Sequence, residues 1–424
     1  FGGRSRRRSV GGRPFPPQCA RGAQGGARKG SGVGASRPAT TRKAAMAAPG
    51  ARRAKVLPLT SVWEEDKVHE AVGNTHFAKH MFKVWRHLIR NADCQRLEDV
   101  PWRELSVPKP MERILCDGFH AYTCTIFHMD ESVRGDTTKM VVRLQDGFDV
   151  ETVVMRHRGR STACVSSQVG CKMGCKFCAT GTLGIIGNLT AGEIIEQIVF
   201  ANRVAQLRNV VYMGMGEPLN NMSSVQASIN ALLDQRRFSL KGSHITVSTV
   251  GVVPRIRQLT REMPDVRLAV SLHAPNQRLR EDIVPTAGAY PLPDLMDAIF
   301  EHSRDTRRTK GDLRTIMIEY ILIRDVNDMP EVARELGELL QPLGQGAYLN
   351  LIPYNPTDVP EDYRPPLPEA VTEFHRIMVH DYGVYTKIRK EMGQDIDGAC
   401  GQLALKAGGG GGAGGGAATG RPRS

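Results

Sequence analysis

The sequence lacks any run of 18 or more apolar residues, so neither a transmembrane helix nor a membrane partner is expected. Cysteine is sparse: nine in 424 residues, an odd number that fits a disulfide framework poorly and suits a reducing compartment. Acidic residues are absent before Glu64, while the first 63 positions carry 14 Lys and Arg. The net charge of +13 therefore belongs to this leader, since the other 43 basic residues balance 44 acidic ones. RNA binding by the rest of the chain must depend on a local patch.

Composition divides the chain into four expected parts. Residues 1–63 are expected to be a disordered basic leader, either an organelle transit peptide or an over-extended translation whose true start is Met46. Residues 64–155 should form an accessory domain that is mainly helical up to about residue 130. Residues 156–405 carry the core, and the glycine-rich residues 406–424 form a disordered tail.

Strand and helix patterns alternate from about Cys164 onward. The clearest helix covers residues 192–207, where Thr190 and Glu193 form a capping box. This alternation predicts a parallel sheet with right-handed crossovers, and about six such units form a full or partial (βα) barrel. The expected strands are residues 163–167, 209–213, 244–248, 266–272, 315–321, 347–352 and 384–388, preceded by short strands at 139–144 and 151–155.

Three cysteines lie within eight residues, in the run Cys-Lys-Met-Gly-Cys-Lys-Phe-Cys from Cys171 through Cys175 to Cys178. A [4Fe-4S] cluster normally takes four thiolates, so three leave one iron open to a small molecule. A zinc site would need four ligands, usually as two separated pairs, and no such set is evident. The run favours a cluster that performs chemistry, with zinc or structural thiols as the alternatives.

Polar and glycine-rich loops follow several expected strands, and in a barrel the carboxyl ends of the strands form the active-site face. Glu217, in Gly-Met-Gly-Glu-Pro, and Ser248 offer a carboxylate and a hydroxyl to the amino group and ribose of a nucleoside. Ser271 and His273 close another strand, although each alone reads as an ordinary loop residue.

Two further cysteines lie outside the run. Cys400 stands between small residues near the end of the chain, and Cys164 precedes the run by seven residues. Alone, Cys400 reads as a bystander thiol. With Cys164 it becomes a candidate redox or nucleophile pair.

The long motifs at 164–178, 214–218, 271–275 and 395–403 closely resemble the RlmN-type dual-specificity RNA methyltransferases of the radical S-adenosylmethionine (SAM) superfamily. The match covers roughly residues 70–405. The resemblance implies an α/β fold, a partial (βα)6 radical-SAM barrel with a small, mainly helical N-terminal accessory domain that helps to bind RNA.

The resemblance also implies a reaction that uses two SAM molecules per turnover. One methylates Cys400. The second binds the open iron of a [4Fe-4S] cluster on Cys171, Cys175 and Cys178, and its cleavage gives a radical that activates the methyl group for addition to carbon 2 of an adenine. Cys164 then releases the product by forming a disulfide with Cys400. Glu151 matches the family's proton acceptor, although it could equally be a solvated strand residue. The positions that match SAM contacts are Gly216, Glu217, Ser248, Ser271, Leu272, His273 and Asn355.

The family's substrates are large-subunit rRNA and, in some members, tRNA. An electron donor such as a flavodoxin or ferredoxin system is implied, and we expect a monomer. The expected compartment is the cytoplasm, or the plastid or mitochondrial matrix if the leader is a transit peptide. Two alternatives share the cysteines: a Cfr-like enzyme that methylates carbon 8 of adenosine, and a non-catalytic, metal-containing RNA-binding protein.

Overall fold

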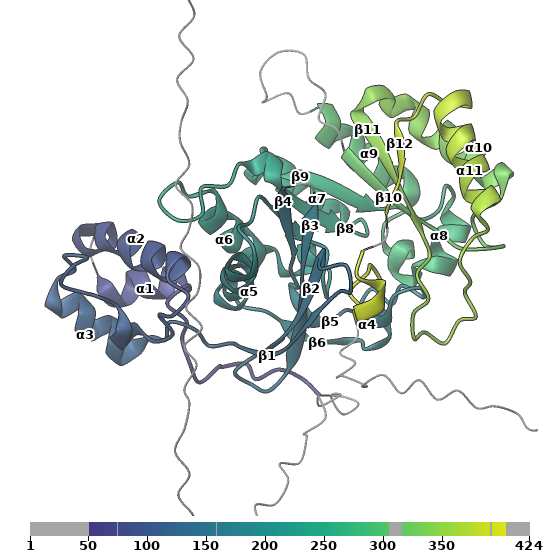
Figure 1. Ribbon diagram of the computed structural model, residues 1–424. Coiled ribbons are helices and arrows are strands. Elements are labelled where there is room, and N and C mark those ends of the chain that lie inside the picture. The colour runs from purple at the N-terminus through teal and green to yellow at the C-terminus, as the bar shows by residue number, and fades with distance from the viewer. Residues whose placement is uncertain (1–50, 74, 158, 305–315, 391, 404–424) are drawn as a thin grey trace, which may run out of the picture. The chain divides into compact units, whose positions relative to one another are not determined.

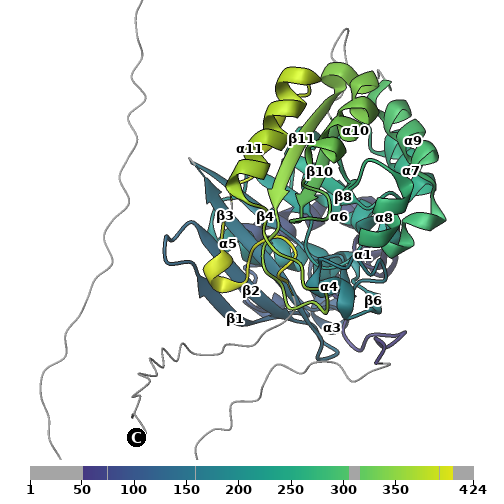
Figure 2. The same ribbon diagram turned by 90° about the vertical axis from the view of Figure 1, so that its right-hand side faces the viewer.

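The computed structural model describes residues 51–73, 75–157, 159–304, 316–390 and 392–403. The expected tail and residues 1–50 of the expected leader lie outside the described residues. Figures 1 and 2 show a curved sheet with helices packed along it. Among the described residues, no helix combines the length and the apolar character needed to cross a bilayer.

One ten-stranded sheet organises the described chain, in the order β1-β2-β3-β4-β7-β8-β9-β10-β11-β12. Its first four strands are antiparallel, and from β4 onward every pairing is parallel. Strands β1 and β12 form its two edges, so the described sheet is a partial barrel, as expected. The strands are β1 (Thr125–Glu131), β2 (Thr137–Arg143), β3 (Asp149–His157), β4 (Arg160–Cys164), β7 (Asn209–Tyr212), β8 (Ile245–Thr249), β9 (Arg267–Ser271), β10 (Ile316–Leu322), β11 (Ala347–Pro353) and β12 (Thr386–Ile388), with β5 (Gln168–Gly170) and β6 (Ile185–Asn188) as a separate pair.

Helices alternate with the parallel strands, and most of them bury their apolar faces in the same core. Figure 2 shows α7, α9, α10 and α11 along the outside of the curved sheet. Helix α5 begins with the expected capping box: the Thr190 hydroxyl accepts from the backbone of Glu193, and the Glu193 carboxylate accepts from the backbone of Thr190. These helices are α4 (Ala179–Thr182), α5 (Ala191–Val204), α6 (Met222–Leu233), α7 (Val253–Glu262), α8 (Gln277–Ile283), α9 (Leu292–Arg304), α10 (Pro330–Leu340) and α11 (Pro368–Arg376).

Three helices form the N-terminal part: α1 (Glu65–Val72), α2 (Thr75–Arg90) and α3 (Lys109–Gly118). They share an apolar core with Ile195 and Val199 of α5. The buried carboxyl of Glu196 adds a polar link, because it accepts hydrogen bonds from the Ser61 hydroxyl and from the backbone of Thr123 and Cys124. The α1–α3 group is therefore tied to α5 by both apolar packing and hydrogen bonds.

The expectation of mainly helical structure up to residue 130 is wrong at its end, where β1 forms. Strand β1 is an edge strand and is exposed along most of its length, so its sequence shows no apolar alternation to reveal it. Strands β1–β3 join the core sheet, which therefore continues across the expected boundary at 155/156.

The expected leader also differs from the structure over residues 51–63. The Arg53 guanidinium pairs with Glu193 at 2.5 Å and with Asp146 at 2.7 Å, and Trp63 is buried. The basic composition suggested a solvated tail. The buried carboxylates of Glu193 and Asp146 instead hold Arg53, and with it this segment, in place.

Candidate active site

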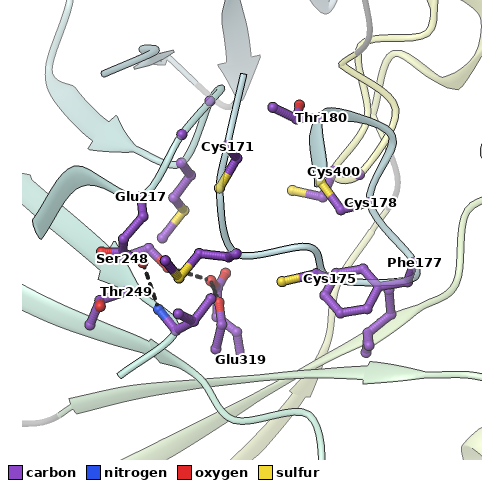
Figure 3. Close-up of a pocket in the computed structure, with 18 of the residues that line it drawn as sticks. Cys171, Cys175, Phe177, Cys178, Thr180, Glu217, Ser248, Thr249, Glu319 and Cys400 are labelled. Atoms are coloured by element: carbon purple, nitrogen blue, oxygen red, sulfur yellow. Dashed lines mark hydrogen bonds between the residues drawn. The ribbon is translucent and has the colours of Figure 1, made fainter. Parts of the chain in front are cut away.

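A cavity of about 850 Å³, partly open to solvent, lies where the cysteine run meets the carboxyl ends of the parallel strands. The cavity brings together most of the residues expected from the sequence (Figure 3). The expected residues that line it are Cys171, Cys175, Cys178, Gly216, Glu217, Ser248, Ser271, His273 and Cys400.

The cysteine run is fixed by contacts with its surroundings. Cys178 donates its backbone N–H to the Cys175 carbonyl at 3.0 Å, which closes a tight turn around the last two thiols. Phe177 meets the His273 ring edge-on, with the centroids 4.7 Å apart. A Cβ on Gly181 would lie 2.8 Å from the Cys175 carbonyl oxygen, so only glycine allows this close approach.

The three thiols meet the chemical demand of a [4Fe-4S] cluster, since all face one cavity that has room for a further ligand. Among the described residues, no three His, Cys, Asp or Glu side chains converge to hold a single metal ion. A cluster makes a different demand, because each thiolate binds its own iron. Burial raises the pKa of Cys171 to about 12 and that of Cys175 well above its usual value, so binding a metal must displace protons from these thiols.

The Gly214–Pro218 loop packs tightly against the start of the cysteine segment. Gly216 has φ +100°, and a Cβ there would lie 2.5 Å from the Gln168 side chain. The Glu217 carboxylate accepts from the backbone N–H of Leu219 at 3.0 Å and of Val250 at 2.9 Å. Burial raises its pKa to about 7, although these hydrogen bonds act in the opposite direction. Glu217 thus joins the ends of β7 and β8 while facing the cavity.

Two expected hydroxyls share a carboxylate that the sequence reasoning missed. Glu319, on β10, accepts from the Ser248 hydroxyl at 2.9 Å and lies 3.5 Å from that of Ser271. Strand register explains the grouping, because Ser271 pairs with Glu319 across β9 and β10. An acidic residue at an inward-facing strand position was the available signal.

The two residues after Ser271 mainly stabilise the local structure at the end of β9. His273 has φ +63° and accepts a hydrogen bond at Nδ1 from the Ile321 backbone, while burial lowers its pKa to about 3. Its imidazole is therefore neutral, with the proton on Nε2. Leu272 is fully buried and does not line the cavity, although its backbone links β9 to Glu319 and Arg280.

The segment that carries Cys400 is attached directly to the cysteine run. Ala179 donates its backbone N–H to the Gly401 carbonyl at 2.9 Å, and the Thr180 hydroxyl donates to the Leu403 carbonyl at 2.5 Å. Asn355 donates its side-chain N–H to the Cys400 carbonyl at 3.2 Å. Asn355 lies beside Cys400 in an adjoining cavity and does not line the main one. These contacts hold the Cys400 thiol next to the cysteine run.

A second cavity, of about 430 Å³, is lined by both Cys164 and Cys400 together with Cys178 and Arg389. Burial raises the pKa of Cys164 to about 12, and Cys400 acts in the same direction. Burial also raises the pKa of Cys400, whereas Arg389 lowers it by its charge and by a hydrogen bond. Arg389, which the sequence reasoning missed, is therefore the cation that favours the thiolate of Cys400.

Glu151 lies on β3, away from both of these cavities. It is 1% exposed, and its carboxylate is 3.5 Å from the ammonium of Lys139 on β2, which is 3% exposed. It is therefore not a solvated strand residue. Val153, two positions along the same face of β3, lines the cavity of Cys164 and Cys400. The buried pair with Lys139 is a second feature that composition did not reveal.

Comparisons with known proteins agree with this arrangement. A family model that describes the radical SAM superfamily matches residues 165–337. A probable dual-specificity RNA methyltransferase RlmN from Desulforudis audaxviator is 47% identical over 282 residues, which cover 64% of this chain and 83% of that protein. Dual-specificity RNA methyltransferase RlmN 1 from Myxococcus xanthus is 44% identical over 330 residues, covering 76% of this chain and 88% of that protein.

Two further comparisons concern a third relative and a solved structure. Ribosomal RNA large subunit methyltransferase N from Nitrosopumilus maritimus is 40% identical over 320 residues, covering 72% of this chain and 87% of that protein. The crystal structure of a radical SAM methyltransferase from Sphaerobacter thermophilus superposes with a TM-score of 0.71 at 34% identity, covering 82% of this chain and 99% of that one. The chain therefore belongs to the RlmN family of dual-specificity RNA methyltransferases, within the radical SAM superfamily.

Proposed function

We propose that this protein methylates carbon 2 of an adenosine in RNA and carries the methyl group on Cys400. The observation that carries the proposal is that Cys400 lines one cavity with Cys171, Cys175 and Cys178. Large-subunit rRNA is the proposed first substrate, in keeping with the name of the Nitrosopumilus relative. The dual specificity in the names of other relatives agrees with a second RNA substrate, for which we propose tRNA.

The proposed cofactors are one [4Fe-4S] cluster and two SAM molecules per turnover. Bound to the three cysteines, the cluster would supply the electron that starts radical chemistry at the methyl carbon carried by Cys400. Such chemistry suits the target, because carbon 2 of adenine is electron-poor and a plain methyl cation donor does not attack it usefully. The proposed electron donor is a flavodoxin or ferredoxin system.

The residues of the chain divide the remaining work. Cys400 accepts a methyl group as a thiolate, and the Arg389 guanidinium beside it favours that charged form. Glu217, Ser248 and Ser271 are proposed to orient SAM, a role supported by their position in the cavity lining near the carboxyl ends of strands.

Product release is proposed to use the second thiol. Cys164 shares a cavity with Cys400, so its thiolate can attack the sulfur of Cys400. The S–S bond then replaces the bond from sulfur to the methylene carbon, and that carbon takes up a proton to become the methyl group of the released base. Glu151 takes the proton from the adenine ring. Glu151 lies on the same face of β3 as Val153, which lines the cavity shared by Cys164 and Cys400.

Anaerobic reconstitution of the full chain with iron, sulfide and a reducing system tests the proposal. The protein is incubated with SAM carrying a labelled methyl group and with rRNA or tRNA, and the nucleosides are identified by chromatography and mass spectrometry. We expect labelled 2-methyladenosine. A product labelled at carbon 8 would assign the Cfr-like reaction instead. A colourless protein that contains one zinc would refute the proposal that this protein is an enzyme.

Two cysteine variants complete this experiment. Cys400→Ala should abolish methylation of RNA because it removes the methyl carrier. Cys116→Ala is the matched control, because this free thiol lies on α3, outside the cavities that hold Cys400. Normal turnover by the Cys400 variant would show that the methyl group takes another route.

A further inference from the structure

The face of the sheet that lines the cavity includes one face of strand β12, and along this strand it extends toward the amino ends of the parallel strands. Its ladder extends beyond its three residues, because Leu349 donates to the Tyr385 carbonyl and Arg389 donates to the Leu351 carbonyl. Tyr385, Lys387 and Arg389 are spaced two apart, so their side chains leave the same face of the strand. Arg389 reaches Cys400, and this face is therefore the one that lines the active site.

Strand register confirms this orientation. Glu319, which lines the main cavity, pairs with Asn350 on β11, and Asn350 pairs with Lys387. One row nearer the amino ends, Tyr348 on β11 lies beside Tyr385. Tyr385 and Arg389 are four positions apart, which is about 13 Å along the strand at roughly 3.3 Å per residue.

Two aromatic rings and two cations gather at this position. The rings of Tyr348 and Tyr385 have centroids 6.0 Å apart, and the Lys387 ammonium lies 5.8 Å and 5.4 Å from them. Arg267 begins β9 on the same face, two residues before Ala269, and its charge acts on the Tyr348 hydroxyl. We name Tyr348, Tyr385, Lys387 and Arg267 the tyrosine–cation strip.

The strip has features of a binding surface. Tyr385 is 60% exposed, although tyrosine usually buries its ring. Lys387 and Arg267 are both exposed, and neither forms an ion pair with a carboxylate in the part of the chain that the structure describes. A lysine on an edge strand can serve to prevent sheet-to-sheet pairing, but that role does not require an exposed aromatic ring beside it.

The exposed ring of Tyr385 next to exposed cations matches the chemistry of single-stranded RNA. Bases of unpaired nucleotides stack on tyrosine, and lysine and arginine neutralise the phosphates that link them. The net charge of the whole protein gave no such indication, because it is concentrated in the leader. Outside the leader, basic and acidic residues are nearly equal in number, so RNA binding there needs a local positive patch. This patch lies in line with the active site.

We propose that the tyrosine–cation strip binds the unpaired nucleotides that flank the target adenosine. A base stacks on Tyr385, while Lys387 and Arg267 contact phosphates. The strip thereby directs the strand toward Cys400. The inference depends on the proposed function for the identity of the target base, but RNA binding by the strip can be measured without any methylation.

The test measures affinity of the full reconstituted protein for a fluorescently labelled RNA hairpin with an adenosine-containing loop, across a series of salt concentrations. Tyr385→Ala should weaken binding by about tenfold, since stacking on one aromatic ring contributes about 1–3 kcal/mol. Tyr385→Phe, which keeps the ring, should restore most of the affinity. Lys387→Gln and Arg267→Gln should each reduce the slope of log K against log salt by about 0.7, the value for one phosphate contact on a single strand.

The matched control is Arg334→Gln, which removes an exposed cation from α10 and should leave both affinity and salt slope unchanged. If Tyr385→Ala and Lys387→Gln bind the hairpin with wild-type affinity and wild-type salt slope, the inference is wrong. It is also wrong if the wild-type protein does not bind the hairpin. Binding that depends on the strip, in a protein that methylates no RNA, would instead refute the proposed function alone.

Discussion

The guanidinium of Arg389 lies 3.7 Å from the carboxylate of Glu319, and this pair joins the two halves of the active site. The Glu319 carboxylate accepts hydrogen bonds from the hydroxyls of Ser248 and Ser271, which face the proposed SAM position. Arg389 contacts Cys400, the proposed methyl acceptor. A single chain of polar contacts thus runs from the hydroxyls of Ser248 and Ser271 through Glu319 and Arg389 to Cys400.

Arg389→Gln should slow methylation of Cys400. Removing the cation raises the pKa of the thiol further, so less thiolate is present at neutral pH. One pKa unit corresponds to about a tenfold loss of rate, and the rate should recover as the pH is raised. The pH profile of Cys400 methylation, followed by mass spectrometry of the intact protein without RNA, measures this. Arg389→Lys keeps the charge and should recover part of the rate, and an unshifted profile in Arg389→Gln would exclude the charge effect.

Cys164→Ala should trap a covalent adduct between Cys400 and the RNA. Without the second thiol, no disulfide can form to release the methylated base. The adduct is detected by denaturing gel electrophoresis with labelled RNA, and treatment with nuclease should leave one modified nucleotide on the protein. Free methylated RNA at the normal yield from this variant would contradict the role of Cys164, and Cys116→Ala serves as the control for loss of a thiol.

The buried pair of Lys139 and Glu151 should contribute to both stability and catalysis. Lys139→Met removes the ammonium 3.5 Å from a buried carboxylate, and it should lower the free energy of unfolding by about 3–5 kcal/mol. Glu151→Gln keeps the shape of the side chain but cannot take a proton. It should therefore slow formation of methylated RNA while Cys400 is still methylated. Loss of both reactions in a folded Glu151→Gln protein would place Glu151 in the first methyl transfer instead.

The contribution of Glu196 to the free energy of unfolding should decrease as the pH rises. Burial raises its pKa from 4.5 to about 7, so between these pH values the folded state binds more protons than the unfolded state. Stability from this group is complete below pH 4.5 and falls as the pH approaches 7, by about 1–3 kcal/mol. Thermal unfolding of the wild-type protein and Glu196→Gln across this range measures the effect. The variant should show a flatter dependence, and an unchanged slope would mean that other groups dominate.

The sequence predicted most of the parallel strands well, because they follow from local patterns. The roles of the cysteines stay predictions, although the cysteine run does lie beside the cavity. The capping box at Thr190 and Glu193 and the loops after the strands lie where they were expected. Strand β1 could not be found this way, since an exposed edge strand has no buried face to produce alternation.

The charged residues of the site were missed for a related reason. Glu319, Arg389 and Lys139 are ionisable residues that read as solvated positions in a linear sequence. Their pairing is set by the sheet: Lys139 meets Glu151 across neighbouring strands β2 and β3, and Glu319 on β10 meets Arg389, which follows β12 and is distant in the chain. Leu272 shows the opposite case, because its motif position suggested a ligand contact and the structure buries it in the core.

The attachment of residues 401 and 403 to residues 179 and 180 has a consequence for the order in which this protein is made. Synthesis begins at the amino end, so the ribosome produces the cysteine run well before Cys400 emerges. Until then, residues 179 and 180, which follow the cysteine run, lack the hydrogen bonds that residues 401 and 403 make with them. We expect biosynthetic iron–sulfur delivery to take place at that stage, and arrival of the last segment to complete these contacts. A chain that stops just before Cys400 should consequently still acquire its iron but lose it readily to air.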